Sequence, residues 1–158
     1  WHCHVDAQNG TGFVNDGYLA GPGLAPLIDR LPDISRRVEA DIVIVDAGRN
    51  DGMAGEALVR AAITRCFDAL RAAYPHARLV IVLPTLLDAW QPWEYQQLAM
   101  VLCEVEEQHH ATVVDPTSVE GFAGLDATGP LVCFDGFHPS AAGQAHYAEV
   151  LTGLLRRT

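Results

Sequence analysis

The sequence predicts an α/β protein in which helices cover both faces of a parallel β-sheet. Two apolar, β-branched runs at 41–46 and 78–83 have the continuous pattern of strands that are buried on both sides. Segments with helical periodicity follow them, at 56–74 and 92–109. Alternation of strands and helices along a chain is typical of a parallel sheet whose crossover helices lie on its two faces.

The N-terminal part of the chain has weaker signals. Residues 2–6 have the pattern of a short strand, and the sequence Asn-Gly-Thr-Gly at 9–12 predicts a turn. The region 24–37 has helical character but contains Pro32, which removes a helix hydrogen bond. We therefore expect short helical turns there.

The remaining elements follow in order. The helix at 56–74 should turn one set of side chains inward, namely Leu58, Ala62, Cys66, Ala69 and Leu70. The helix at 92–109 should do the same with Tyr95, Leu98, Leu102 and Val105. A third strand at 112–115 stops at Pro116, and the last helix at 140–156 begins with Ser140 as its N-cap.

The composition fits one folded domain over residues 1–158, since 49% of the residues are apolar and 19% are charged. The formal net charge of −10 argues against nucleic acid and anionic membranes as partners, because both need a basic face. No apolar run approaches the roughly 20 residues of a transmembrane helix. The sequence therefore predicts no transmembrane segment.

The four cysteines, Cys3, Cys66, Cys103 and Cys133, are widely spaced and contain no Cys-x-x-Cys pair. This spacing argues against a structural zinc site. Cys66 and Cys103 fall on apolar helix faces, so we expect buried free thiols. The alternative is one disulfide, which would imply an oxidising compartment.

An aspartate and a histidine three residues apart, Asp135 and His138, precede the last helix. The carboxylate can hold one imidazole nitrogen while the other nitrogen serves as a base for a nucleophile. The alternative is an Asp-Gly turn with a histidine that only leads into the helix. The position of the pair, after the apolar run 131–134 and at the end of the sheet where α/β sites form, favours the catalytic interpretation.

The turn Gly48-Arg49-Asn50-Asp51 comes directly after the strand at 41–46. The Asn50 amide is suited to donate a hydrogen bond to an oxyanion, with Asp51 bracing the turn. Alternatively, the turn only caps the following helix. In the first glycine-rich turn, the backbone N–H of Gly10 is our choice for a second oxyanion donor, with Gly12 as the alternate; a turn that needs positive φ explains the same glycines.

Together these blocks resemble the SGNH hydrolases, also called GDSL-type esterases and lipases. That family has four blocks in chain order: a Ser, a Gly, an Asn, and a His with an Asp three residues before it. Gly10 resembles the second block, Asn50 the third, and Asp135 with His138 the last. The resemblance covers essentially the whole chain and implies a three-layer α/β/α sandwich with a flavodoxin-like parallel sheet.

The resemblance also implies a mechanism. The Ser attacks an ester carbonyl, His138 acts as the base, and Asp135 orients it. The backbone N–H of the Ser, the Gly10 N–H and the Asn50 side chain form the oxyanion hole. No cofactor and no metal are implied.

The first block of the family, Gly-Asp-Ser, has no counterpart in this chain. The serines are Ser35, Ser118 and Ser140, and none of them is expected at a strand-to-helix turn. Cys133 is a nucleophile by chemistry, but strand alternation is expected to turn it into the core. We therefore expect the nucleophile to lie outside this chain.

The missing block is also a missing strand. In the family's sheet order 2-1-3-4-5, that strand lies between residues 2–6 and 41–46. Its absence should leave 2–6 without a partner and 41–46 as a bare apolar edge. We expect about 30 residues upstream to supply it, for example as a cleaved N-terminal fragment that carries the Ser strand and stays bound as a partner.

Two further groups of residues were considered as ligand sites. His2, His4 and Asp6 share one face of the expected strand, but exposed polar residues of an edge explain the pattern equally, and we predict no metal site. Trp90 and Phe137 are candidates for a substrate pocket. The aromatic residues Trp90, Trp93, Tyr95 and Phe122 belong either to that pocket or to a core cluster at the start of the helix.

The function expected from the sequence is hydrolysis of a small or lipid-like acyl ester by a serine esterase or lipase. One alternative is an acyltransferase that moves the acyl group to a sugar or another alcohol. An alternative of another class is a binding module without a catalytic Ser. The resemblance favours a secreted or cell-envelope location over a cytoplasmic one.

Overall fold

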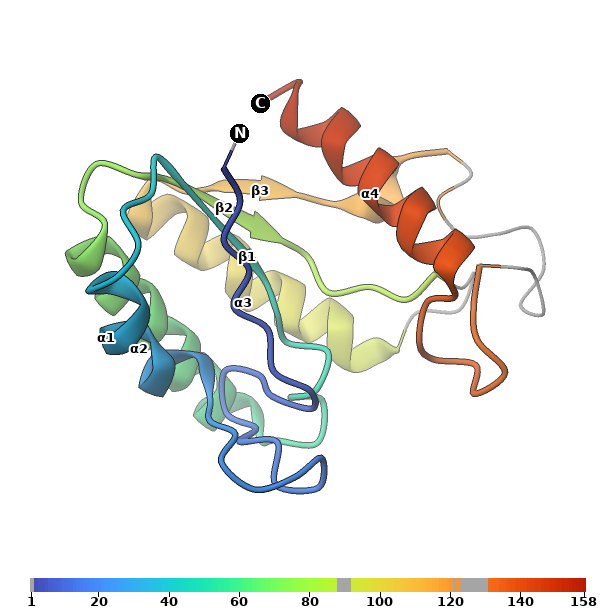
Figure 1. The fold of residues 1–158 in the computed structure, drawn as a ribbon, viewed down its shortest axis with the longest axis horizontal. Coiled ribbons are helices and arrows are strands. Elements are labelled where there is room, and N and C mark those ends of the chain that lie inside the picture. Colours follow the sequence, from blue (N-terminus) through green and yellow to red (C-terminus); the bar gives the residue numbers. More distant parts are fainter. Residues whose placement is uncertain (1, 88–91, 121, 123–130) are drawn as a thin grey trace.

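The computed structural model describes residues 2–87, 92–120, 122 and 131–158. It confirms an α/β fold (Figure 1). Its elements in chain order are α1 (Leu27–Ser35), β1 (Ile42–Asp46), α2 (Glu56–Ala73), β2 (Arg78–Val82), α3 (Trp93–His109), β3 (Thr112–Val114), the 3₁₀ helix η1 (Pro116–Ser118) and α4 (Ala141–Leu155).

The sheet of the described residues contains three parallel strands in the order β1-β2-β3. Ile42 pairs with Arg78 at the start of β1, and Val80 pairs with Thr112 at the start of β3. All three strands therefore end at the same edge, and the segments that follow them gather there. The β-branched runs form strands because both faces of the pleat are covered.

Side chains alternate between two apolar layers, one on each face of the sheet. Leu79 and Ile81 point into the larger layer, which α2 and α3 cover and which α1 extends. Val80 and Val82 point into the other layer, where Leu151 and Leu154 of α4 pack. Figure 1 shows α4 on one side of the sheet and α2 and α3 on the other, so the predicted three-layer arrangement is present.

The helices differ from the expectation in three places. Residues 27–35 form one helix, α1, that continues through Pro32, and it buries Leu31. Leu58 is 53% exposed, because the buried side of α2 contains Val59, Ile63 and Phe67 instead. All four cysteines are free thiols, but only Cys66 is buried, while Cys103 lies exposed on α3. The inward set of α3 is as predicted.

The N-terminal segment does not form the predicted strand. Residues 2–7 are irregular, and Val5 is 74% exposed. The physical reason is that a strand needs a neighbour, and β1 has only β2 as a partner among the described residues. In the part of the chain that the structure describes, no strand pairs with the opposite edge of β1, and Ile44 is 46% exposed.

Within the described ranges, no helix is both long and apolar enough to span a membrane.

Candidate active site

The loop that carries Asp135 and His138 is closed on itself by backbone hydrogen bonds. Val132 and Pro139 form an antiparallel bridge. The Cys133 N–H donates to the His138 carbonyl at 2.7 Å, and the Ser140 N–H donates to the Leu131 carbonyl at 2.9 Å. Because the loop closes just before α4, the start of the helix fixes where the histidine lies.

The cap of α4 also holds this loop. Ser140 is the N-cap, as predicted, and its hydroxyl accepts a hydrogen bond from the Gly143 N–H at 3.1 Å. A Cβ at Gly143 would lie far inside 3.0 Å of the Leu131 carbonyl oxygen, a distance that Cβ atoms essentially never show. Glycine at 143 therefore lets the helix and the loop touch through their backbones.

The side chains of Asp135 and His138 form a hydrogen-bonded pair. Asp135 Oδ2 lies 2.7 Å from His138 Nδ1, while Oδ1 accepts from the Phe137 and His138 N–H groups at 2.9 and 3.0 Å. These bonds, the Phe137 N–H first, lower the pKa of the Asp135 carboxyl to about 2. An ionised carboxylate can only accept, so Nδ1 is the donor, and in the neutral imidazole Nε2 carries the lone pair.

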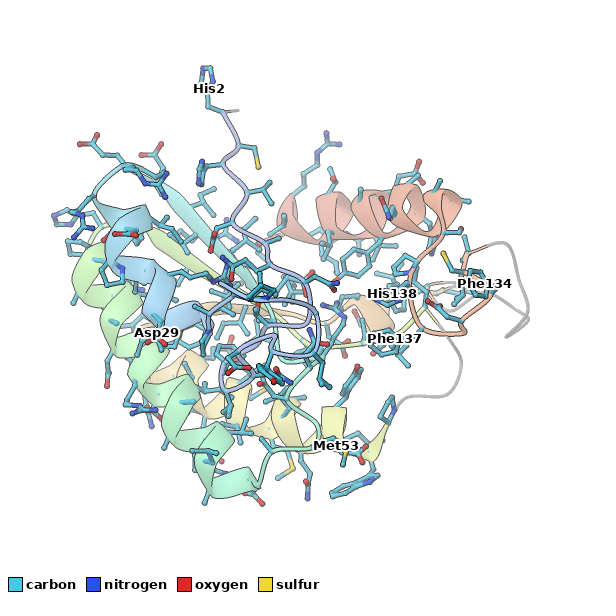
Figure 2. The ribbon with its side chains drawn as sticks, turned by 60° about the horizontal axis from the view of Figure 1, so that its bottom comes forward. His2, Asp29, Met53, Phe134, Phe137 and His138 are labelled. Carbon is cyan, nitrogen blue, oxygen red and sulfur yellow. The ribbon has the colours of Figure 1, made fainter. Side chains whose placement is uncertain are left out.

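His138 presents that lone pair to the surroundings. Its side chain is 64% exposed, and in the described part of the chain its Nε2 has no hydrogen-bond partner. Figure 2 shows His138 and Phe137 on the loop at the right of the molecule, and Met53, from the turn after β1, below them. A base with one nitrogen held and the other free is the arrangement that proton removal from a nucleophile requires.

The turn after β1 holds Asn50 at the carboxyl edge of the sheet. The side-chain amide of Asn50 donates to the Thr11 carbonyl at 2.9 Å. The backbone carbonyl of Asn50 accepts from Asn15 Nδ2 at 3.0 Å. Asn50 thus lies against the glycine-rich turn that sequence analysis grouped with it. The amide has a second N–H, which leaves one donor for a ligand.

Asp51 fastens the same two turns together from inside. It is 2% exposed, and its carboxylate accepts three backbone N–H groups at 2.7–3.0 Å, those of Phe13, Val14 and Asn15. A Cβ at Gly12 would overlap this carboxylate, so glycine is required at that position. The bracing role expected for Asp51 has this geometric basis.

The two glycines considered as oxyanion donors have different surroundings. The Gly12 N–H donates to the Asn15 carbonyl at 2.9 Å and is therefore occupied. Gly10 has φ of 70°, and its N–H donates to no acceptor among the residues that the structure describes. This difference favours Gly10 over Gly12.

Arg49, for which the sequence predicted no role, makes three hydrogen bonds in the site region. Its guanidinium reaches the Thr85 carbonyl, the Asp46 carboxylate and the Tyr147 hydroxyl, at 2.8, 2.5 and 2.8 Å. A signal was present in the sequence, because a large cation between Gly48 and Asn50 needs partners. Tyr147 lies 98 residues further along, so the identity of that partner was not predictable from spacing.

The three serines have other roles in the structure. Ser35 ends α1, and its hydroxyl donates to the Pro32 carbonyl at 3.4 Å. Ser118 lies in η1 and donates to the Asp115 carbonyl at 2.6 Å. Ser140 caps α4. Cys133 is half-buried, and its thiol donates to the Pro139 carbonyl at 3.4 Å.

The aromatic residues divide between the core and the site. Phe137 is 39% exposed. Its ring makes an edge-to-face contact with the His138 ring, with the ring centroids 5.0 Å apart. Tyr95 and Phe122 are buried, whereas Trp93 is 60% exposed. Trp90 lies outside the described residues.

Within the described residues, no group of three His, Cys, Asp or Glu side chains is arranged to hold a metal ion. The described residues hold two local sets of groups: the hydrogen-bonded Asp135–His138 pair before α4, and the Asn50 amide beside the turn of Gly10, to which it is joined through Thr11. Groups of these kinds suit acyl transfer through a tetrahedral oxyanion.

Solved structures with the same fold include TesA and two proteins described as esterases. TesA matches with a TM-score of 0.65 and 20% identity, over 82% of this chain and 70% of TesA. The esterase EstA from Pseudoalteromonas sp. matches with a TM-score of 0.65 and 16% identity, over 82% of this chain and 69% of EstA. A carbohydrate esterase family 3 protein from Talaromyces cellulolyticus matches with a TM-score of 0.57 and 21% identity, over 80% of this chain and 66% of that protein.

These identities show a shared fold. No curated protein matches the sequence significantly. A family model does match, over residues 4–146, and it describes the GDSL-like lipase/acylhydrolase family. This range includes the turns of Gly10 and Asn50 and the loop of Asp135 and His138, and it confirms the resemblance to the SGNH hydrolases. The chain belongs to the GDSL-like lipase/acylhydrolase family of hydrolases.

Proposed function

We propose that the protein is a serine ester hydrolase that acts on carboxylic esters of small or lipid-like acyl groups. The observation that carries the proposal is the Asp135–His138 pair, in which the carboxylate holds Nδ1 at 2.7 Å and Nε2 is free. The nucleophilic serine comes from a segment outside this sequence, because Ser35, Ser118 and Ser140 hold local turns and caps.

The chemistry follows from these groups. His138 Nε2 takes the proton of the serine hydroxyl while the oxygen attacks the ester carbonyl, and the Asn50 amide and the Gly10 N–H donate to the oxyanion. The alcohol leaves with the proton from His138, which produces an acyl-enzyme. Water then repeats the two steps, with His138 as base and then acid, and releases the carboxylic acid.

The open edge of β1 supports a separate serine-bearing strand. The Arg78 N–H donates to the Asp41 carbonyl, so the backbone groups of residues 41, 43 and 45 face β2. Those of Ile42 and Ile44 therefore face the open edge. A strand that pairs there in parallel would end at the same edge of the sheet as the Asn50 turn, and its last residue would enter the site.

Phe137 supports an acyl substrate. Its ring contacts the His138 ring and remains 39% exposed, so it offers apolar surface directly beside the proposed base. An acyl chain that packs on this ring would bring its carbonyl near Nε2. Trp90, the second residue proposed for this pocket, remains a proposal from the sequence.

The test compares two proteins: this chain alone, and the chain joined to the coding sequence that precedes it in its gene. Both are treated with a fluorophosphonate, which reacts with activated serines, and digested for mass spectrometry. Both are also assayed on p-nitrophenyl acetate and p-nitrophenyl octanoate. We expect labelling of a serine in the added segment, turnover only in the longer protein, and loss of both with His138→Ala.

Three results would contradict parts of the proposal. Labelling of Ser35, Ser118 or Ser140 would place the nucleophile inside this chain. Transfer of the acyl group to added glycerol, with little free acid formed, would identify a transferase. If the longer protein folds but shows neither labelling nor turnover, the hydrolase proposal is wrong and the result favours a binding module without a catalytic Ser.

A further inference from the structure

Arg49 lies at the centre of a hydrogen-bonded network that joins three parts of the fold. Its Nε donates to the Thr85 carbonyl in the segment after β2, and its two terminal nitrogens donate to Asp46, at the end of β1, and to Tyr147, in α4. The Tyr147 hydroxyl in turn donates to Asp46 Oδ2 at 2.9 Å. Arg49, Asp46 and Tyr147 therefore form a closed cycle of hydrogen bonds.

The charged side chains of the network are partly buried. The Arg49 and Asp46 side chains are 24% and 29% exposed. Burial works to lower the pKa of Arg49, but Asp46 and Tyr147 outweigh it and raise that pKa. Burial also raises the pKa of Tyr147, so its hydroxyl keeps its proton and can donate to Asp46. A charged guanidinium paired in this way has well-defined geometry.

The position of Tyr147 connects this network to the proposed base. Tyr147 lies in the second turn of α4, and the same helix is capped by Ser140 and follows the closed loop of His138. On the other side, Arg49 directly precedes Asn50. The Arg49–Tyr147 bond thus spans the two halves of the proposed site, the turn after β1 and the loop before α4.

We propose that Arg49 is a positioning residue: it fixes α4, and with it the His138 loop, against the turn that carries Asn50. The inference rests on the proposed function for the roles of His138 and Asn50. It goes further in assigning their relative placement to one side chain. Arginine is required because three acceptors lie in different directions, and a lysine ammonium at the end of a flexible chain cannot reach all three at once.

The chain offers a matched control at the opposite end of the sheet. Arg71 likewise joins separate elements through its guanidinium, which donates to the backbone carbonyls of Ala77 before β2 and His109 at the end of α3, at 2.9 and 2.7 Å. It ties helices to the sheet as Arg49 does, but at the edge where the strands begin. Arg71→Lys should therefore cost stability without changing the site.

The experiment measures two quantities for Arg49→Lys, Tyr147→Phe and Arg71→Lys in the active, full-length protein. The first is hydrogen exchange of the backbone N–H groups of α4 near Tyr147 and of the backbone N–H of Asn50. The second is kcat and KM for p-nitrophenyl acetate. Tyr147→Phe is the milder change, because it removes one hydroxyl and keeps the ring, so it remains informative if Arg49→Lys does not fold.

We expect exchange in α4 to become about tenfold faster in Arg49→Lys and Tyr147→Phe, as for the loss of a hydrogen bond to a charged group. We expect kcat to fall about tenfold to 100-fold with KM nearly unchanged, because the reacting groups are misplaced and not removed. Arg71→Lys should change neither. Unchanged α4 exchange in both site variants would overturn the inference, and so would an equal kcat loss in Arg71→Lys.

The two proposals fail in different ways. If the wild-type protein shows no turnover, the proposed function is wrong, and exchange in α4 still reports whether Arg49 holds the helix. If turnover is present and α4 exchange does not respond to Arg49→Lys, the positioning role is wrong while the hydrolase remains.

Discussion

The contact between α4 and the His138 loop gives the most specific prediction, Gly143→Ala. A methyl group at position 143 would meet the Leu131 carbonyl oxygen well inside 3.0 Å, and it would also lie 3.0 Å from Leu87 Cδ1. The carbonyl or the helix must move by about 1 Å before the contact is normal. The Leu131 carbonyl accepts from the Ser140 N–H, so the movement also breaks the bond that closes the loop.

The magnitude follows from a comparison with Gly153, in the same helix, where an added Cβ meets nothing within 4 Å. Gly153→Ala should stabilise the protein by about 0.5–1 kcal/mol, because alanine loses less backbone entropy than glycine. Gly143→Ala has the same gain, offset by about 1–3 kcal/mol of overpacking and about 1 kcal/mol for the lost hydrogen bond. The two variants should therefore differ by about 2–4 kcal/mol.

Urea denaturation measures the free energy of unfolding of both variants, and kcat is measured on the active protein. A shift of about 1 Å in the His138 loop should lower kcat by about 100-fold in Gly143→Ala. Gly153→Ala should keep the wild-type kcat. Equal stabilities and equal kcat for the two variants would refute the argument that the helix must touch the loop through its backbone.

Three further predictions concern the proposed site. Asp135→Asn should lower kcat by about 10⁴, because the amide no longer fixes the imidazole tautomer. The lowered pKa of Asp135 means that its contribution to stability is present above the ordinary value of 3.8 and is lost as the pH falls toward 2, so unfolding curves of wild type and Asp135→Asn should converge near pH 2. Asn50→Ala should lower kcat by about 10²–10³. It should also lower the free energy of unfolding by about 1 kcal/mol, because it removes the bond to the Thr11 carbonyl. A kcat above a tenth of wild type would contradict an oxyanion role. Asp51→Asn should destabilise the protein by about 2–4 kcal/mol in urea denaturation, because it replaces one of the two accepting oxygens with an NH₂ group, which leaves at least one buried backbone N–H facing another donor. Asp16→Asn, at an exposed turn, is the control and should have almost no effect.

The sequence predicted the elements that have their own periodic pattern. The strands at β1 and β2 and the inward face of α3 are where the apolar runs indicated, because burial alone determines them. The prediction of a strand at 2–6 was wrong, because a short strand is stable only when a neighbouring strand pairs with it. The prediction that Leu58 points inward was wrong, because the buried side of α2 is shifted by one residue, to Val59.

The site was predictable to the extent that it is local. Asp135 and His138 are three residues apart, and a carboxylate that accepts the following N–H groups forms such a pair without help from the rest of the fold. The ties of Asp51 to residues 13–15 and of Arg49 to Tyr147 join distant segments, and nothing in the residue spacing indicates them. A single sequence reveals the chemical groups of a site more readily than the contacts that hold them.

The open edge of β1 has a consequence for behaviour in solution. Free backbone groups beside an exposed Ile44 form a template on which a strand of another copy can pair. The formal net charge of −10 opposes such pairing by repulsion between copies. Salt limits that repulsion to about 8 Å at physiological ionic strength. Because no strand of the described residues covers that edge, this chain should self-associate more as sodium chloride is added, and sedimentation velocity would record the change.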